Sequence, residues 1–338
     1  MIRMLESGND INLNEFLLIC EAVGMDLECL GPATDAIIPV GNDSDAPCHL
    51  RIRVNGSVCD VYLSDVSVGQ YKSMVAQLSA LLQSSIKRRD CVAQAIRAMT
   101  RLCPKANPSD LYHHVIYRQY LDPANHLKGT TADNLNQSWV RTSGEGFEQA
   151  LADHYNPALQ QHGIALVPTF SRTIKKRVIA ALGLHGQVTD SKIDIGVTVS
   201  HNGAPVLLGG VHAKASLAER VTDDIPASRI MMQTGFLSIL STLDVKSFGP
   251  PQGNLLNEGE LGTLKNPSDK RRYVEVQGDF SACFSYNTRT VPSPSETQSG
   301  KHIYTVDFAN PQDVFHDFLV AESKAWLRKT KDPSRHRL

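Results

Sequence analysis

The amino-acid sequence predicts a mixed α+β fold of the α/β class, with a central mixed sheet flanked by helices and a smaller α+β domain at the N-terminus. Two apolar runs, residues 193–199 and 206–211, are joined by a turn that contains Gly203 and Pro205, which is typical of a β-hairpin. Between residues 67 and 102 apolar side chains recur at helical spacing. Further apolar runs of strand length follow the hairpin, so helices and strands are interleaved along the chain.

The N-terminal region is predicted to contain a second hairpin. Residues 48–54 and 58–63 alternate between apolar and polar side chains on either side of Asn55 and Gly56. An Asn-Gly pair between two such runs is a strong signal for a tight turn. A short apolar helix is predicted for residues 14–23.

The region after the central hairpin is predicted to alternate between helix and strand. Residues 229–243 are apolar and long enough for a helix packed on the sheet. Three shorter runs, 273–276, 282–286 and 302–308, are predicted as strands. A helix over residues 314–327 is expected to close the domain.

The prolines of residues 104–108 interrupt the helical pattern and mark the predicted domain boundary. We therefore expect an N-terminal domain of residues 1–105 and a catalytic domain of residues 106–338. A chain of 338 residues is long enough to bury the core of one large and one smaller domain.

The composition excludes several classes of protein. With 34 basic and 35 acidic residues the chain has no overall basic field, although a basic groove can be offset by acid elsewhere. Its seven cysteines form no C-x-x-C pair, which argues against a zinc site or a disulfide framework and favours a reducing cytoplasm. Neither a membrane-length apolar run nor a signal peptide is visible. The prediction is a soluble cytoplasmic protein with no membrane partner and no nucleotide cofactor.

A carboxylate, an imidazole and an ammonium group are expected to meet at one end of the central hairpin. Side chains alternate between the two faces of a strand, so His212 and Lys214 emerge on one face and Ala213 on the other. If strand pairing brings Asp194 to this end, the three side chains converge. Each alone has a structural explanation, as a capping aspartate or a solvated lysine at a strand end. Together they are costly within a sheet unless they pair with one another or with a metal, and therefore predict a functional site.

The spacing of these residues resembles that of a nuclease family. Asp194, two predicted strands and then Lys214 resemble the PD-(D/E)xK pattern, and Lys214 is followed after four residues by Glu219 and Arg220. This combination is similar to that of the type II restriction endonucleases that cut sites built on CCGG or CCNGG, the AgeI/BsaWI-like subgroup. The resemblance covers roughly residues 138–262 and implies a restriction-endonuclease-like sheet.

Two positions depart from the family pattern. Ile193 stands before Asp194 where the pattern has proline, and His212 stands two residues before the lysine where an acid is common. The subgroup tolerates a non-acidic residue there, because a later acid takes over metal binding. The resemblance assigns this role to Asp224, with Asp223 as the alternative.

The resemblance implies Mg²⁺ as the cofactor and gives five residues a place in catalysis. Asp194 is expected to be the principal metal ligand, Asp224 or the helix residue Glu148 the second ligand, and Lys214 the catalytic cation. Because Mg²⁺ prefers oxygen ligands, His212 is expected to lie near the metal as a hydrogen-bonding neighbour.

Base recognition is expected from Glu219 and Arg220. If a helix begins near Ser216, a plausible N-cap, both residues lie in its first turn, close to Lys214. In the major groove an arginine donates to guanine O6 and N7, and a carboxylate accepts from cytosine N4, so neighbouring Glu and Arg side chains can read adjacent C and G positions.

Two further basic residues are candidates for DNA contact. The sequence around Arg141 resembles a context in which an arginine reaches toward DNA, although an ion pair with Glu145 explains it equally well. Lys246 follows Asp244 in a second Asp-x-Lys pattern. This rival motif lacks a strand-borne acid like Asp194, so Lys246 is assigned to DNA contact.

The resemblance implies a bacterial enzyme that cleaves double-stranded DNA at a short palindromic site with a CC/GG core and leaves 5′-phosphates. A palindromic site has two-fold symmetry. A protein that matches this symmetry needs two equivalent copies, so a homodimer is expected. The N-terminal domain is expected to extend the DNA grip or the dimer contact. Two alternatives remain: a non-catalytic DNA-binding or interaction protein on a nuclease-like scaffold, and a structure-selective repair nuclease.

Overall fold

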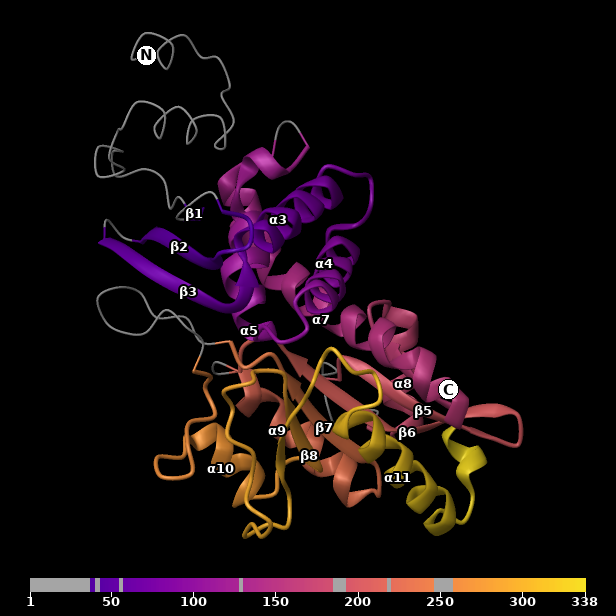
Figure 1. Cartoon of the computed structure of the whole chain (residues 1–338). Helices are drawn as coiled ribbons and strands as arrows, with labels where there is room; N and C mark the ends of the chain where they lie inside the picture. The colour runs from indigo at the N-terminus through magenta and orange to yellow at the C-terminus, as the bar shows by residue number, and fades with distance from the viewer. Residues whose placement is uncertain are drawn as a thin grey trace, which may run out of the picture. The chain divides into compact units, whose positions relative to one another are not determined.

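The computed structural model describes residues 37–39, 43–54, 57–127, 130–184, 193–217, 220–245 and 258–338 (Figure 1). The chain separates into two compact units, residues 1–69 with 248–255 and residues 70–247 with 256–338. This division differs from the predicted boundary between residues 105 and 106, because α4 (Arg88–Leu102) packs along α7 (Ala132–Leu159) in the larger unit. The helix predicted at residues 14–23 lies outside the described residues.

The smaller unit contains a three-stranded antiparallel sheet. Its strands, in order, are β1 (Ile37–Pro39), β2 (Pro47–Val54) and β3 (Ser57–Ser67). Val54 pairs with Ser57 across the turn, which confirms the predicted N-terminal hairpin. Cys48 and Leu50 are buried while His49 between them is partly exposed, as the alternation along the strand requires.

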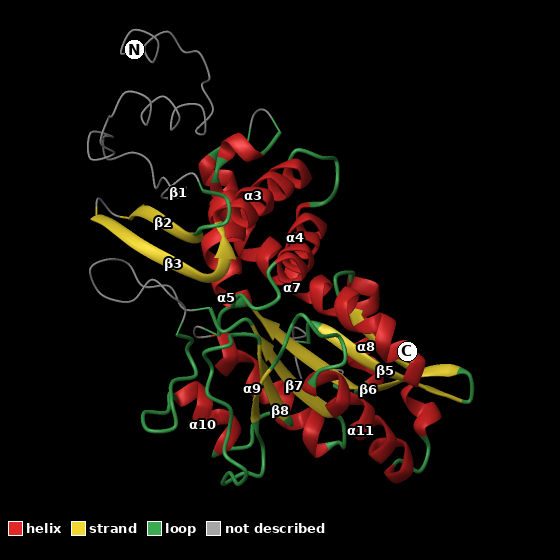
Figure 2. Cartoon of the chain, viewed as in Figure 1, coloured by secondary structure: helices red, strands yellow, loops and turns green. Residues whose placement is uncertain are grey.

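The larger unit is built on a six-stranded mixed sheet (Figure 2). Its strands, in spatial order, are β4 (Ile164–Pro168), β5 (Ile195–His201), β6 (Ala204–Lys214), β7 (Leu237–Thr242), β8 (Ala282–Ser285) and β9 (Ile303–Thr305). The strands from β4 to β6 pair antiparallel, and those from β6 to β9 pair parallel. The predicted fold class is therefore confirmed, and β5 and β6 form the predicted central hairpin.

Helices α7, α9 (Arg220–Gln233), α10 (Asp269–Glu275) and α11 (Val314–Lys329) pack against this sheet. The structure also describes α3 (Val68–Leu82), α5 (Pro108–Leu111), a π-helix (Tyr112–Tyr117), α6 (Arg118–Leu121) and α8 (Arg172–Ala181). Short 3-10 turns occupy Pro123–Asn125, Gln160–His162 and Pro333–His336. Gly146 lets α7 approach α4 closely, because an added Cβ would lie 2.6 Å from Cγ1 of Val92.

The prediction of one helix over residues 229–243 was wrong in its second half. Helix α9 ends at Gln233, Gly235 adopts a left-handed φ of 86°, and β7 follows. Strand β7 pairs in parallel at both edges, and its residues from Ser238 to Thr242 are buried, including two serines and a threonine among the apolar side chains. Periodicity does not distinguish such a strand from a buried helix.

The prediction of a strand at residues 273–276 was also wrong. Residues 269–275 form α10, whose first turn is capped by the Ser268 side chain, which accepts a hydrogen bond from Arg271 N at 3.2 Å. By contrast β8, β9 and α11 confirm the elements predicted at 282–286, 302–308 and 314–327.

An apolar cluster holds α9 against the sheet. It joins the segment that follows β6 to β7, β8 and α10, and its buried members are Leu217, Val221, Ile225, Leu240, Leu261, Val274, Phe280, Cys283 and Ile303. This packing fixes the beginning of α9 close to the end of β6. Among the described helices none is long and apolar enough to cross a membrane.

Asp313 links α11 to α7 and supplies a stability prediction. Its Oδ1 accepts hydrogen bonds from the backbone N–H of Phe315 at 2.9 Å and of His316 at 3.2 Å, and its Oδ2 accepts one from Tyr155 at 2.7 Å. Asp313→Ala removes the cap and leaves the buried Tyr155 hydroxyl without an acceptor, so the free energy of unfolding should fall by about 2 kcal/mol. Urea unfolding measures the change. Asp313→Asn keeps one acceptor oxygen for the cap and loses only the acceptor for Tyr155, so it should lose less, and equal losses would contradict this account.

Candidate active site

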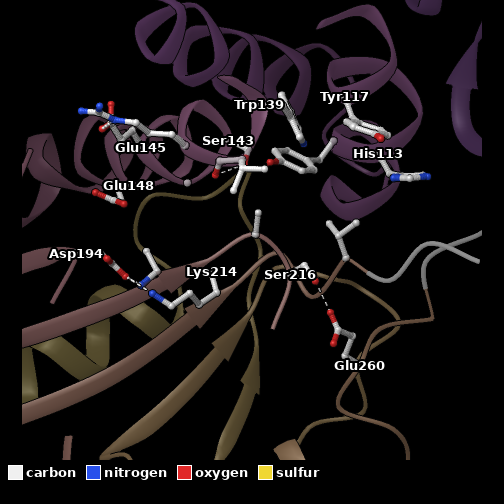
Figure 3. Close-up of a pocket in the computed structure, with 17 residues that line it drawn as sticks. His113, Tyr117, Trp139, Ser143, Glu145, Glu148, Asp194, Lys214, Ser216 and Glu260 are labelled. Carbon is white, nitrogen blue, oxygen red and sulfur yellow. Dashed lines mark hydrogen bonds and ion pairs between the residues drawn. The ribbon is translucent and has the colours of Figure 1, made fainter. Parts of the chain in front are cut away.

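Strand pairing brings Asp194 and Lys214 together. Asp194 directly precedes β5 and Lys214 ends β6, and the antiparallel pairing of Ile195 with Val211 places these two ends side by side. Oδ2 of Asp194 accepts hydrogen bonds from Nζ of Lys214 at 2.7 Å and from the backbone N–H of Ala213 at 2.9 Å (Figure 3).

Helix α9 adds a second carboxylate to this pair. Oδ2 of Asp224 lies 3.1 Å from Nζ of Lys214, and the Asp224 side chain is only 2% exposed. Its neighbour Asp223 is exposed. The geometry therefore favours Asp224 over Asp223 as the later acid of the cluster.

His212 lies behind Asp224 and is fully buried. Its Nδ1 is 3.7 Å from Oδ2 of Asp224, and its Nε2 is 3.0 Å from Oγ of Ser238. Ser238 donates to Oγ of Ser228 at 2.6 Å, which leaves Nε2 of His212 as the donor to Ser238. This chain of hydrogen bonds fixes the orientation of the imidazole beside Asp224.

A cleft of about 670 Å³ opens at the cluster. Asp194 and Lys214 line one end, and Glu148 of α7 lies on the wall above them (Figure 3). Burial, and then the charge of Asp194, raise the pKa of Glu148 to about 9. Glu148 is therefore a carboxylic acid at neutral pH until a cation enters the site.

The charges of the cluster depend on one another. Burial raises the pKa of Asp224, an effect that His212 and Lys214 partly offset. Burial alone would lower the pKa of Lys214, but Asp194 and Asp224 together raise it above its ordinary value. Lys214 therefore keeps its positive charge between two acids that have little access to water.

The chemistry of the two aspartates suits a hard divalent cation. Asp194 and Asp224 carry carboxylate oxygens, the ligands that Mg²⁺ prefers, and Glu148 lines the same cleft as Asp194. Oδ2 of Asp224 is buried and accepts no well-aligned hydrogen bond, so it has capacity for a further positive partner. Within the described ranges, no group of three or more His, Cys, Asp or Glu side chains is arranged to hold a metal ion, and the ammonium of Lys214 lies between the two aspartates.

Comparisons with known proteins identify the family. Residues 171–312, which include Asp194, Lys214 and Asp224, match the family model described as BsaWI restriction endonuclease type 2. The chain is 49% identical over 274 residues to the type II restriction enzyme AgeI of Thalassovita gelatinovora, a match that covers 79% of this chain and 96% of that enzyme. The chain belongs to the BsaWI family of type II restriction endonucleases.

The fold of this endonuclease agrees with that assignment. The structure of this chain matches the crystal structure of the specific complex of restriction endonuclease AgeI with DNA, with a TM-score of 0.74 and 49% sequence identity. The match covers 80% of this chain and 97% of the AgeI chain. The resemblance predicted from Asp194, Lys214 and the residues that follow is confirmed, as is the restriction-endonuclease-like sheet.

The structure describes only some of the residues predicted to contact DNA. Arg141 lines the cleft with a side chain that is 80% exposed, and its Nε donates to Oε1 of Glu145 at 2.6 Å, the pairing that was the alternative explanation. Arg220 begins α9, but its side chain, like Glu219 and Lys246, lies outside the described residues.

In the rival Asp244-x-Lys246 motif, the aspartate has a structural role. Asp244 is buried directly after β7. Its Oδ1 accepts a hydrogen bond from the backbone N–H of Glu260 at 2.6 Å, and its Oδ2 accepts one from Thr290 Oγ1 at 2.8 Å. These bonds tie Asp244 to the backbone at Glu260 and to Thr290.

Sequence reasoning missed two groups of residues that line the cleft. One is aromatic and comprises Tyr112, His113, Tyr117 and Trp139. The other is the pair of Ser216 and Glu260, in which the serine hydroxyl donates to Oε1 of the glutamate at 2.5 Å. Ser216 was predicted as a helix N-cap, whereas its hydroxyl bonds to Glu260 and α9 begins at Arg220. The only feature of the sequence that could have indicated the aromatic group is the concentration of Tyr and His side chains in residues 112–117.

Glu148 supplies a pH-dependent prediction for the metal-free endonuclease. Its pKa is 4.5 when unperturbed and about 9 in the folded protein, so the folded state retains a proton that the unfolded chain releases between these values. Stability from this group is therefore lost as pH rises through that window. Glu148→Gln cannot lose this proton. The melting temperature of the variant minus that of the wild type should therefore increase from pH 5 to pH 9, measured in EDTA.

The matched control is Glu296→Gln, which changes an exposed carboxyl outside the cleft. Its melting temperature should differ from that of the wild type by the same amount at every pH. A difference between Glu148→Gln and the wild type that is independent of pH would show that Glu148 is ionised at neutral pH in the folded protein.

Proposed function

We propose that this endonuclease uses Mg²⁺ to hydrolyse double-stranded DNA at a short palindromic site with a CC/GG core, of the CCGG or CCNGG type, and leaves 5′-phosphates. The observation that carries the proposal is the contact of Lys214 with two aspartates, the partly buried Asp194 and the buried Asp224, at one end of a cleft. The DNA complex of AgeI supports duplex DNA as the substrate.

Phosphodiester hydrolysis requires an attacking water, stabilisation of added negative charge and departure of the 3′-oxygen. The water oxygen bonds to phosphorus and the P–O3′ bond breaks, which leaves a 5′-phosphate and a 3′-hydroxyl. When bound by Asp194 and Asp224, Mg²⁺ supplies charge neutralisation and makes water more acidic. Lys214, which lies beside the two acids, stabilises negative charge on the phosphate oxygens.

Two residues support this centre. Glu148 faces Asp194 and Lys214 from α7 and offers a further carboxylate to the cation. His212 packs behind Asp224 with Nδ1 3.7 Å from its Oδ2, and Ser238 fixes the other ring nitrogen. His212 therefore acts as a positioning residue behind the ligand, consistent with the preference of Mg²⁺ for oxygen.

Recognition is assigned to residues next to the cleaving centre. Arg220 begins α9, the helix that also carries Asp224, so a shift of this helix on DNA would move both residues. Arg220 is proposed to donate to guanine and Glu219 to accept from cytosine, with each contact contributing about 1–3 kcal/mol of discrimination. Arg141 and Lys246 are proposed to contact the DNA around this core.

A palindromic site presents the same sequence on both strands, so we propose that the endonuclease acts as a homodimer whose two active sites each cut one strand. The N-terminal unit is proposed to extend the DNA grip or the contact between the two copies.

Removal of Lys214 tests the centre directly. Lys214→Ala should lower the rate of plasmid cleavage by at least about 100-fold, because the charge that stabilises the reacting phosphate is lost. Specific binding, measured by fluorescence anisotropy in Ca²⁺, should persist. Retained cleavage by the variant would remove Lys214 from the catalytic role.

Digestion of a long DNA by the wild type separates the remaining alternatives. Discrete fragments in Mg²⁺ and none in EDTA support a site-specific enzyme, and sequencing of the fragment ends reads the core. A smear would indicate a nuclease without sequence readout. Binding without cleavage under both conditions would indicate a non-catalytic DNA-binding protein.

A further inference from the structure

The wall of the cleft opposite the aspartates is aromatic. Tyr112, His113, Tyr117 and Trp139, here called the aromatic wall, line the same cleft as Asp194 and Lys214 (Figure 3). Val140, the next residue on α7, also lines the cleft and is 53% exposed. The surface opposite the charged cluster is therefore largely apolar.

A π-helix builds this wall. Ring centroids of Tyr112 and Tyr117 lie 5.5 and 5.2 Å from that of Trp139. Residues five apart point about 140° from each other in an α-helix of 3.6 residues per turn, whereas the i to i+5 register of a π-helix aligns them. Tyr120 packs on the same indole at 4.9 Å. The uncommon helix thus fixes Trp139 among three tyrosines and leaves part of its ring to the cleft.

The wall carries no charge to attract phosphate. Burial, and then the neighbouring His114, hold the pKa of His113 well below its usual range, so its imidazole is neutral. His113 stacks on Tyr117 at 5.4 Å, which extends the flat apolar surface. Such a surface fits the face of a ring and gives no ionic contact, and in a DNA strand the available rings are the deoxyribose and the base.

We propose that the aromatic wall is a nucleotide subsite, in which Trp139 contacts the apolar face of a deoxyribose or a base of the strand cleaved at Lys214. The inference rests on the proposed function. Trp139 and Glu148 are nine residues apart on α7, or about 13 Å along the helix at 1.5 Å per residue. At 3.4 Å per nucleotide, the contact lies within about four nucleotides of the reacting phosphate.

The chain offers a direct optical test, because its two tryptophans are Trp139 and Trp326. Trp326 is 8% exposed and donates to the carbonyl of Gly235 at 3.0 Å, outside the cleft. Trp326→Phe therefore leaves Trp139 as the sole indole. Titration of this variant in Ca²⁺ with a duplex that carries the recognition site should quench and shift its emission. The matched control, Trp139→Phe, should show unchanged emission from Trp326.

Affinity provides a second measurement. Trp139→Ala should weaken DNA binding by about 5- to 150-fold, and Trp139→Phe, which keeps an aromatic face, should lose less. A fluorescent base analogue, placed at each position of the recognition site in turn, distinguishes a base contact from a sugar contact. Brighter emission of the analogue marks a base that has left the duplex stack. Unchanged emission of the analogue together with quenched Trp139 emission marks a contact with the deoxyribose. DNA binding with unchanged Trp139 emission would overturn the subsite, whereas absence of any DNA binding would overturn the proposed function.

A second inference comes from the position of Lys214 between the two acids. Its Nζ contacts Oδ2 of Asp194 at 2.7 Å and Oδ2 of Asp224 at 3.1 Å. Asp194 Oδ2 already accepts two hydrogen bonds, from Lys214 and from the backbone of Ala213. A cation held by these two oxygen atoms needs the place that the ammonium group now occupies.

We infer that Lys214 couples DNA binding to cation binding in this endonuclease. Without DNA the ammonium group competes with the cation for Asp194 and Asp224. A DNA phosphate offers Lys214 another anionic partner, which releases the carboxylates to the cation. By linkage, the cation must then favour DNA binding by the same factor. This inference also rests on the proposed function.

Binding of Mn²⁺, measured by electron paramagnetic resonance of the free ion, tests this competition without any cleavage. In the absence of DNA, Lys214→Met should bind Mn²⁺ about 5- to 150-fold more tightly than the wild type, because no ammonium group competes. DNA should raise the Mn²⁺ affinity of the wild type more than that of the variant. Lys270→Met, which removes a lysine paired with Glu260, should bind Mn²⁺ like the wild type.

The two possible failures have different signatures. Equal Mn²⁺ affinities of Lys214→Met and the wild type without DNA would overturn the competition and leave the metal-dependent function intact. No Mn²⁺ binding by either protein, with or without DNA, would overturn the proposed metal dependence itself.

Discussion

The ammonium of Lys214, held between the carboxylates of Asp194 and Asp224, is the interaction on which the arrangement of the site depends. Three charges with little access to water are stable only as a group, since removal of one leaves a buried charge without a partner. Their contact fixes the start of β5, the end of β6 and the first turns of α9 relative to one another. The same arrangement gathers carboxylates for a cation and a positive charge for a phosphate in one place.

The topology around β6 explains why these residues meet. Strand β6, helix α9 and the parallel strand β7 form a crossover unit, so α9 must begin close to the end of β6 before it returns along the sheet. An acid in the first turns of α9 therefore lies beside Lys214, whereas one further along the helix would not. The apolar cluster that includes Leu217, Val221 and Leu240 holds the helix in this position.

The opposite side of the cleft comes from earlier segments of the chain. Helix α7 contributes both Glu148 and Trp139, and the π-helix surrounds the indole with tyrosines. Charged and apolar surfaces thus face each other across one cavity, which matches a substrate whose backbone is ionic and whose sugars and bases are not. Helix α7 packs closely on α4 at Gly146, where a larger residue would clash with Val92.

The sequence by itself determined the central hairpin, the convergence of Asp194 with Lys214, and a family resemblance, because strand alternation and turn residues act over short distances. Only the tertiary structure placed Asp224, already preferred to Asp223, beside Lys214 and set Glu148 against Asp194, since the face that a helix turns inward depends on what it packs against. The same reason explains why residues 237–242 form a strand: their mixture of Leu, Ile, Ser and Thr does not exclude a helix, and the parallel neighbours β6 and β8 decide the outcome. The aromatic wall likewise arises from contact between separate helices, which no local pattern encodes.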